Sequence, residues 1–154
     1  MLVMRLKDVM TGNVQTIAPT ASAEDAWNVM RLHGIHHLVV TDRNRPIGIL
    51  SDRDAGSRRG AAVRRSKTVG ELMTAPAVTA TPAMTIRQAA NVMRGRSIGC
   101  LVVVDAGRPV GIVTVSDLLE VVGRGLDRGV AASERRTLNH RVPHKKIHGG
   151  VRAW

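Results

Sequence analysis

The chain has 154 residues, of which 44% are hydrophobic and 23% charged, so it can bury a core and differs in composition from globally disordered proteins. Phe and Tyr are absent and Trp occurs only as Trp27 and Trp154, which excludes an aromatic stacking platform for single-stranded nucleic acid. The net charge of +11 comes from residues 56–70, with five basic and no acidic residues, and from residues 124–154, with eight basic and two acidic ones, while the rest of the chain is neutral.

The single cysteine, Cys100, rules out an internal disulfide framework and a cysteine-based zinc site, and it favours a reducing compartment. No apolar run approaches the roughly 18 residues that a membrane span needs. The first ten residues also lack the apolar stretch of a secretory signal. We therefore expect a cytoplasmic protein that makes no membrane contacts.

Hydrophobic periodicity in the first half of the chain predicts the order strand, helix, strand, strand, helix. The first helix is amphipathic, with apolar residues such as Ala26 and Met30 at helical spacing, and Gly34 is suited to end it. The strands are rich in β-branched residues, and turn-forming residues separate the last two. In order, we expect a strand at 14–17, a helix at 22–33, a strand at 38–41, a turn at 42–46 and a strand at 47–50.

The second half of the chain repeats this order. Shifting the sequence by 63 residues aligns 10–54 with 73–117 without a gap, and 19 of the 45 positions are identical. Chance does not produce such a match, so the chain contains two copies of one supersecondary unit. The corresponding elements are a helix at 86–94, a strand at 101–104, a turn at 105–109, a strand at 110–113 and a helix from 116 to about 122.

The repeat also predicts the domain organisation. We expect a first repeat at 7–57, a basic linker at 58–70, a second repeat at 71–122 and a basic, flexible tail at 123–154. A unit of about 50 residues buries little core alone, so the copies should pack with pseudo-twofold symmetry into one α/β module with two related clefts. The clefts should differ, because Ala55 and Gly56 after Asp54 make the final helix of the first repeat weak.

Each repeat ends in a strand, a hydroxyl residue and, three positions later, a carboxylate. The pairs are Ser51 with Asp54 and Thr114 with Asp117. One interpretation is a capping box, in which the hydroxyl and the acid bind the first amides of a helix. The other is a nucleotide site, because free amides at a helix start favour phosphate and a carboxylate accepts hydrogen bonds from ribose hydroxyls.

Three stretches recur at the start, middle and end of the two repeats. They are Val9-Met10-Thr11 and Leu72-Met73-Thr74, then residues 34–40 and 98–105, and finally Gly-Ile-x-Ser/Thr-x-x-Asp at 48–54 and 111–117. With these stretches the sequence resembles the cystathionine-β-synthase (CBS) domain family, as a stand-alone pair of CBS domains. The resemblance covers residues 7–122.

The resemblance implies two β-α-β-β-α repeats that bind adenosyl compounds, such as AMP, ADP or ATP, in clefts between them and that form a flat homodimer. In such proteins the aspartates hold ribose and the hydroxyl residues face phosphate, with Arg53 as an additional phosphate ligand in the first repeat only. Residues around the first strands and at the starts of the second strands line the base pocket. The site residues implied are Thr16, Ile35, His37, Ser51, Arg53, Asp54, Thr79, Ile98, Cys100, Thr114 and Asp117.

Other residues invite a choice between structural and functional roles. His33, His36 and His37 could suggest a metal site, but a strand sends neighbouring side chains to opposite faces and no acid or cysteine is near, so we expect none. Cys100 is interpreted as a buried inert thiol or, alternatively, as a redox-sensitive cleft residue. Trp27 either covers the core of its repeat or anchors a dimer interface.

The sequence contains no nucleophile–base pair, no phosphate-binding loop and no acid pair outside the capping positions, so we expect no enzymatic activity and no required cofactor. The expected function is a regulatory sensor of adenine nucleotides that changes its own shape or its partner surface. The alternative is a nucleic-acid-associated protein whose basic linker and tail bind phosphates under the control of the CBS pair. The tail is either a solvated extension or a surface for RNA, DNA or an acidic protein.

Overall fold

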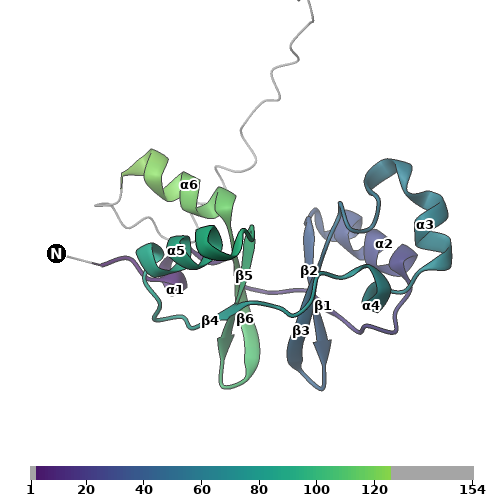
Figure 1. Cartoon of the computed structure of the whole chain (residues 1–154), viewed down its shortest axis with the longest axis horizontal. Helices are drawn as coiled ribbons and strands as arrows, with labels where there is room; N and C mark the ends of the chain where they lie inside the picture. Colours follow the sequence, from purple (N-terminus) through teal and green to yellow (C-terminus); the bar gives the residue numbers. More distant parts are fainter. Residues whose placement is uncertain (1–2, 126–154) are drawn as a thin grey trace, which may run out of the picture.

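The computed structural model describes residues 3–125. Within these residues, six strands form two three-stranded sheets that stand side by side in the middle of the molecule (Figure 1). The first two strands of each sheet are parallel and the last two form an antiparallel hairpin. The strands are β1 (Thr16–Ile17), β2 (His37–Asp42) and β3 (Arg45–Ser51), then β4 (Thr79–Ala80), β5 (Cys100–Asp105) and β6 (Arg108–Thr114). The predicted α/β fold of two related repeats is confirmed.

The strands of the two sheets pair at equivalent positions. Thr16 of β1 pairs with Val39, and the equivalent Thr79 of β4 pairs with Val102. Each hairpin also shifts register at the same position of its strands. The hairpin strands are longer than the sequence predicts, because residues 43–44 both adopt positive φ and close the turn with two residues, the geometry that matches strand twist.

Two amphipathic helices, α2 (Ala23–His33) and α5 (Ile86–Arg96), pack against the two sheets. The hydroxyl of Ser22 caps α2 by accepting a hydrogen bond from the Asp25 amide at 3.0 Å. Gly34 ends the helix in the left-handed conformation at φ 62°, as predicted from the sequence. No helix within residues 3–125 is long and apolar enough to cross a membrane.

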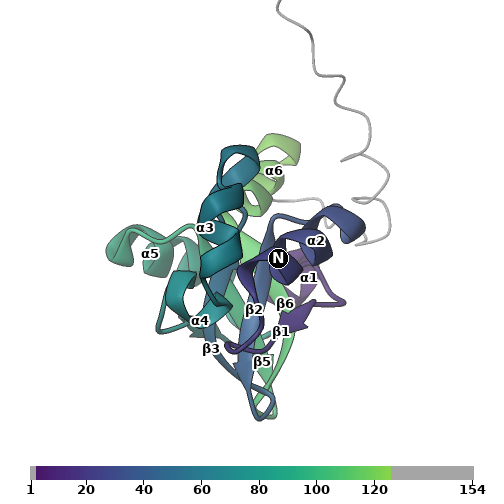
Figure 2. The same cartoon turned by 90° about the vertical axis from the view of Figure 1, so that its right-hand side faces the viewer.

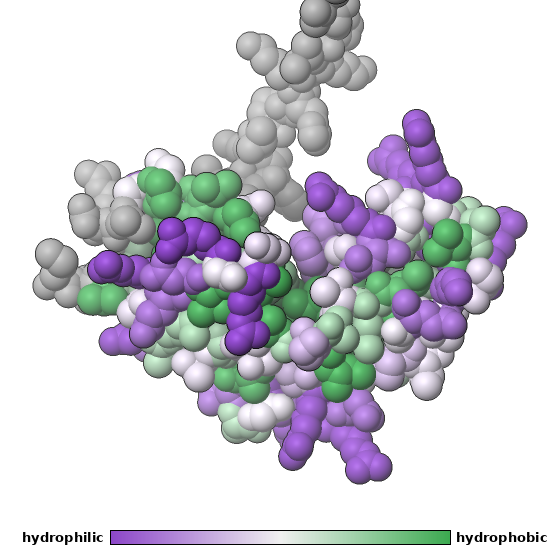
Figure 3. Space-filling view, in the orientation of Figure 1, coloured by the Kyte–Doolittle hydropathy of each residue, from purple (hydrophilic) through white to green (hydrophobic). Residues whose placement is uncertain are grey.

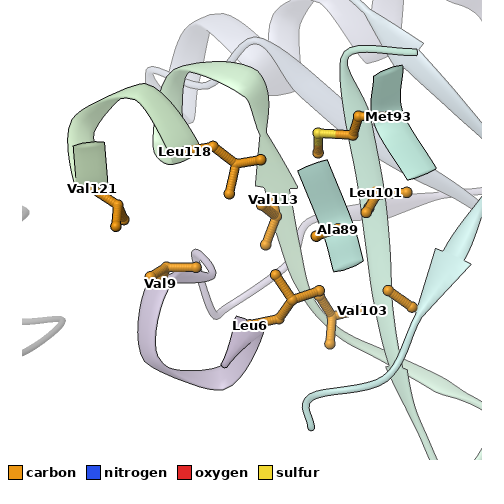
Figure 4. Close-up of a cluster of buried hydrophobic side chains, with 10 residues drawn as sticks. Leu6, Val9, Ala89, Met93, Leu101, Val103, Val113, Leu118 and Val121 are labelled. Atoms are coloured by element: carbon orange, nitrogen blue, oxygen red, sulfur yellow. The ribbon is translucent and has the colours of Figure 1, made fainter. Parts of the chain in front are cut away.

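The repeats exchange their opening helices, which the sequence did not predict. Leu6 and Val9 of α1 (Leu6–Val9) are buried in the core of the second repeat, against α5, β5 and β6 (Figure 4). Val69 of α4 (Val69–Leu72) is buried in the core of the first repeat. Backbone hydrogen bonds fix the segments that cross between the repeats. The Thr11 amide, for example, donates to the carbonyl of Ile112 in β6 at 3.0 Å. The repeats are therefore one cooperative unit, because each core needs residues from the other half of the chain.

The two repeats differ after their last strand. In the second repeat, α6 (Val115–Arg124) begins directly after β6, as predicted. In the first repeat residues 52–56 form turns instead, followed by the 3₁₀ helix η1 (Ser57–Arg59) and by α3 (Ala61–Ser66). The expected weak helix is thus replaced by a turn, and the segment at 58–70 interpreted as a linker supplies a helix. Most of the predicted tail, residues 126–154, lies outside the described residues.

Arg64 explains why this basic segment folds back onto the first repeat. Helix α3 packs against α2 (Figure 2), and Arg64 is only 5% exposed. Its Nη1 donates to the carbonyls of Ala55, at 3.0 Å, and Ser57. Its Nε lies 3.5 Å from a carboxylate oxygen of Glu24, and its guanidinium lies 4.3 Å from the centre of the Trp27 ring. The positive charge of residues 56–70 is therefore partly internal to the fold.

Replacing Arg64 should destabilise the first repeat. We expect Arg64→Ala to lower the free energy of unfolding by about 2–3 kcal/mol, since two carbonyls and a carboxylate lose a charged partner. The neighbouring Arg65 is exposed on the same helix, so Arg65→Ala should change this free energy by less than about 0.5 kcal/mol. Urea unfolding of both variants measures the difference. Equal, small effects would show that Arg64 does not hold the segment.

Candidate ligand-binding cleft between the repeats

A cleft of about 290 Å³ lies between the two repeats. The first repeat contributes residues from β2 and β3 and from the turn after β3. The second repeat contributes the segment before β4 and the segment that enters β5. The lining residues are His37, Ile49, Ser51, Asp54, Thr74, Pro76, Ala77, Val78, Ser97, Ile98, Gly99 and Cys100. Apolar and polar side chains thus line the cleft together, as is typical of small-molecule sites.

The turn at the end of β3 presents Ser51 and Asp54 to this cleft. The Ser51 amide donates to Oδ2 of Asp54 at 2.9 Å, and the Asp54 amide donates to the Ser51 hydroxyl at 3.0 Å. These reciprocal bonds have the geometry of a capping box. Oδ1 of Asp54 has no hydrogen-bond partner within residues 3–125. The capping geometry therefore leaves one carboxylate oxygen able to accept a hydrogen bond from a ligand.

The second repeat has the same arrangement at the start of α6. The Thr114 amide donates to Oδ2 of Asp117 at 2.8 Å, and the Asp117 amide donates to the Thr114 hydroxyl at 3.3 Å. Neither residue lines the cleft described above. Both predicted motifs thus adopt the capping geometry, and the structure brings only the first one to this cleft.

His37 lines the cleft and is close to charged side chains from both repeats. Burial lowers the pKa of its imidazole below the ordinary value of 6.5, although the carboxylates of Asp52, Asp54 and Asp117 act in the opposite direction. His36, which is exposed, also lowers the pKa of His37 slightly by charge repulsion. At neutral pH the imidazole is therefore uncharged and can both donate and accept a hydrogen bond.

His37 should make stability depend on pH. Its pKa is lower in the folded than in the unfolded protein, so its contribution is fully present above pH 6.5 and is lost as the pH falls toward the folded-state pKa. We expect the drop in the urea midpoint between pH 7.5 and 5.5 to be smaller in His37→Gln than in the wild type. His33→Gln, an exposed control in α2, should keep the wild-type drop. An unchanged drop in His37→Gln would contradict this explanation.

Cys100 is the equivalent of His37 in the second repeat and lies in the same cleft, half-buried. Burial, assisted by the charge of Asp117, raises the pKa of its thiol to about 12. The thiol is therefore protonated at neutral pH, and a protonated thiol is a poor nucleophile. These surroundings favour the inert interpretation of Cys100 over the redox-sensitive one.

Besides Thr114 and Asp117, four of the residues implied by the resemblance lie outside this cleft. Thr16 and Thr79 are exposed on the short first strands, and Arg53 is exposed outside the cleft. Ile35 lines a different hollow, formed by the first repeat alone. Conversely, Thr74 and residues 76–78 line the cleft, although the sequence pointed to this segment only as residues around the first strand of the second repeat. The signal was present, because these residues directly precede the strand that holds Thr79.

The side chains of His33, His36 and His37 do not come together at one site. Nδ1 of His36 lies 3.0 Å from Oδ2 of Asp52, whereas His37 faces the cleft. Within residues 3–125, no three His, Cys, Asp or Glu side chains come close enough together to hold a metal ion. Trp27 is half-buried against the core of the first repeat and carries Arg64 over its ring, which favours its role in covering that core.

Comparison with known proteins places both repeats in one family. The family pattern described as "CBS domain" matches residues 6–55 and 69–124. The CBS domain-containing protein YhcV of Bacillus subtilis (strain 168) is 33% identical over 114 residues, which cover 73% of this chain and 81% of YhcV. The repeat boundaries proposed from the sequence differ slightly from the matched residues and stay predictions.

Two solved structures of similar proteins contain adenosyl compounds. The CBS domain pair of protein MJ0100, in complex with 5′-methylthioadenosine and S-adenosyl-L-methionine, has a TM-score of 0.71 and 28% identity, covering 80% of this chain and 98% of that one. CBSX2, in complex with AMP, has a TM-score of 0.66 and 25% identity, covering 81% of this chain and 99% of that one.

Proposed function

Because the chain belongs to the CBS domain family, as a pair of CBS domains, we propose that it is a regulatory module that binds an adenosyl ligand between its repeats. The ligand class is supported by MJ0100 and CBSX2, which bind 5′-methylthioadenosine, S-adenosyl-L-methionine or AMP. We propose no catalytic activity, since within residues 3–125 no hydrogen bond joins His37 to the Ser51 hydroxyl or the Cys100 thiol as a nucleophile–base pair.

The observation that carries this proposal is the combination of groups in the cleft. The unpartnered Oδ1 of Asp54 can accept a hydrogen bond from a ribose hydroxyl. The hydroxyl of Ser51, next to it, can face a phosphate or carboxylate of the ligand. Ile49, Val78 and Ile98 supply apolar surface for a flat base. Thr114 and Asp117 form the equivalent motif in the second repeat.

Isothermal calorimetry with the full chain tests this proposal. The titrants are AMP, ADP, ATP, 5′-methylthioadenosine and S-adenosylmethionine, with GMP and GTP as controls. Saturable binding of an adenosyl compound that GMP does not reproduce is the expected result. Binding that follows only the number of phosphates, regardless of the base, would instead support the alternative function, in which basic segments bind nucleic-acid phosphates.

We further propose that the module is a homodimer and that α6 contributes to its interface. Leu118 and Val121 of α6 face the protein's own core, whereas Leu119 and Val122 on the opposite side are 64% and 63% exposed. Val115 extends this apolar ridge, and Figure 3 shows apolar surface over α6. A helix that is apolar on two sides is suited to bury its second side against a partner, and an isologous contact with a second copy closes the assembly.

Light scattering after size-exclusion chromatography should therefore give twice the monomer mass of 16.6 kDa. Leu119→Asp should shift the protein toward the monomer mass, since it places a charge in the buried ridge. Val3→Asp provides the matched control, because Val3 is equally apolar and 57% exposed but lies outside the ridge. A wild type that stays at monomer mass at micromolar concentration would contradict the proposed dimer.

A further inference from the structure

A second, larger hollow lies on the first repeat, between the C-terminal half of α2 and the turns that follow β3. Its volume is about 940 Å³, and it shares no lining residue with the cleft between the repeats. Trp27, Met30 and Ile35 give it an apolar floor, and Arg31, Arg58 and Arg64 bring positive charge to it. We call this hollow the arginine groove.

The arginine groove has an excess of positive charge. Its single carboxylate, Asp52, lies 3.0 Å from His36, which also lines it. Arg64 is engaged with backbone carbonyls and Glu24. Arg31 and Arg58 are exposed, and neither has a hydrogen-bond or ion-pair partner within residues 3–125. Two guanidinium groups are therefore free to bind an anion at the edge of an apolar floor.

The groove follows from the difference between the repeats. The second repeat continues from β6 directly into α6, whereas the first turns away and forms α3 further along the chain. The floor also differs, because the second repeat has Ala90 where the first has Trp27. Arg31 does have an equivalent, Arg94, which is likewise exposed. The second repeat thus supplies a matched position for a control variant.

We propose that the arginine groove binds a small phosphate-bearing anion, with Arg31 and Arg58 as its ligands. Guanidinium groups bind phosphate through paired hydrogen bonds, and they do so best where they are not already bound to carboxylates. The volume lies within the range of small-molecule sites. This site is separate from the adenosyl cleft and does not depend on that cleft being occupied. Its selectivity for an anion comes from charge complementarity with two arginines that have no partner within residues 3–125.

Trp27 makes the groove observable, since its indole lies in the floor. Tripolyphosphate is titrated into the full chain carrying Trp154→Phe, so that the fluorescence reports Trp27 alone. In this background, Arg31→Ala combined with Arg58→Ala should weaken the binding of tripolyphosphate about 10–100-fold, as expected when charged hydrogen bonds are lost. Arg87→Ala combined with Arg94→Ala removes the same charge from α5 and should weaken binding less than about threefold.

Several results would overturn the proposal. Equal weakening by the two double variants would mean that tripolyphosphate binds through the general charge of the chain. A saturating titration without a change in Trp27 fluorescence would place the anion elsewhere, and tighter competition by hexaglutamate would point to an acidic peptide instead. Asp54→Asn should leave tripolyphosphate binding at the groove unchanged, so a failure of the adenosyl proposal is distinguished from a failure of this one.

Discussion

Asp54→Ala is expected to weaken the binding of AMP, or of whichever adenosyl compound binds best, by about 10–100-fold. The reason is the loss of a charged acceptor for the ribose hydroxyls, which corresponds to about 1.5–3 kcal/mol of binding free energy. Asp54→Asn keeps one neutral acceptor and should lose less. Calorimetry on both variants, and on Asp117→Ala as the equivalent change in the second repeat, also shows which of the two motifs the ligand depends on.

A matched control separates ligand binding from helix capping. Gln88 closes a capping box with Thr85 at the start of α5, where the Thr85 amide donates to Oε1 at 3.0 Å. Gln88→Ala should lower stability by about 1 kcal/mol, as for other lost caps, and leave the affinity for AMP unchanged. If Asp54→Ala behaves like Gln88→Ala, with lower stability and normal affinity, then Asp54 is only a capping residue.

Gly48→Val is expected to have the second large effect, on stability and on ligand binding together. A β-carbon at Gly48 would lie 2.6 Å from Sδ of Met73 and 3.0 Å from the carbonyl oxygen of Thr74. That carbonyl accepts the Ile49 amide at 3.0 Å, which holds the segment lining the cleft against β3. Valine should therefore cost about 3 kcal/mol of unfolding free energy, as for overpacking elsewhere, and should displace part of the cleft wall.

Urea unfolding and AMP calorimetry of Gly48→Val measure these two consequences. Gly95→Ala is the control, because Gly95 lies in α5 with nothing within 4 Å of its would-be β-carbon. Alanine there should raise stability by about 0.5–1 kcal/mol, through helix propensity alone, and leave affinity unchanged. Near-wild-type stability of Gly48→Val would show that the crossing of Thr74 over β3 is not tightly packed.

Local patterns predicted most elements of the fold. The spacing of Ala26 and Met30 and the signal of Gly34 placed α2 within one residue of its bounds, and the 63-residue shift transferred the prediction to α5. The exchange of α1 and α4 was not predictable in this way. The sequence predicted no helix at Leu6–Val9, and a helix of one turn is too short for hydrophobic spacing to reveal it or the core that buries it.

Charge patterning was the weaker guide. The five basic residues between 56 and 70 predicted one solvated segment. Nothing in their spacing indicates that Arg64 is the buried one. Arg64 is buried because it donates to the carbonyls of Ala55 and Ser57. These carbonyls are positioned by the turn that replaces a helix after β3. Such a network is set by tertiary contacts rather than by local propensity.

For the site, the repeated motif identified Ser51 and Asp54, whereas the wall formed by residues 76–78 was expected only as residues around Thr79. Ser51 and Asp54 were predicted together because their spacing serves both a cap and a ligand. Ala77 and Val78 carry no chemistry of their own, and only the packing of their segment across β3 brings them to the cleft. These residues shape the wall of the cleft, and a pattern of polar residues in the sequence does not predict such a role.

The most direct test of the central claim is a map of amide chemical shifts in the ¹⁵N-labelled full chain during titration with AMP. An adenosyl ligand between the repeats should shift the amides that line the cleft, foremost those of Ser51, Ala77 and Gly99, with saturation at a common affinity. Asp54→Asn should weaken the affinity reported by all of them together. Shifts confined to residues 124–154 or to the arginine groove, with these three amides unmoved, would contradict an adenosyl site between the repeats.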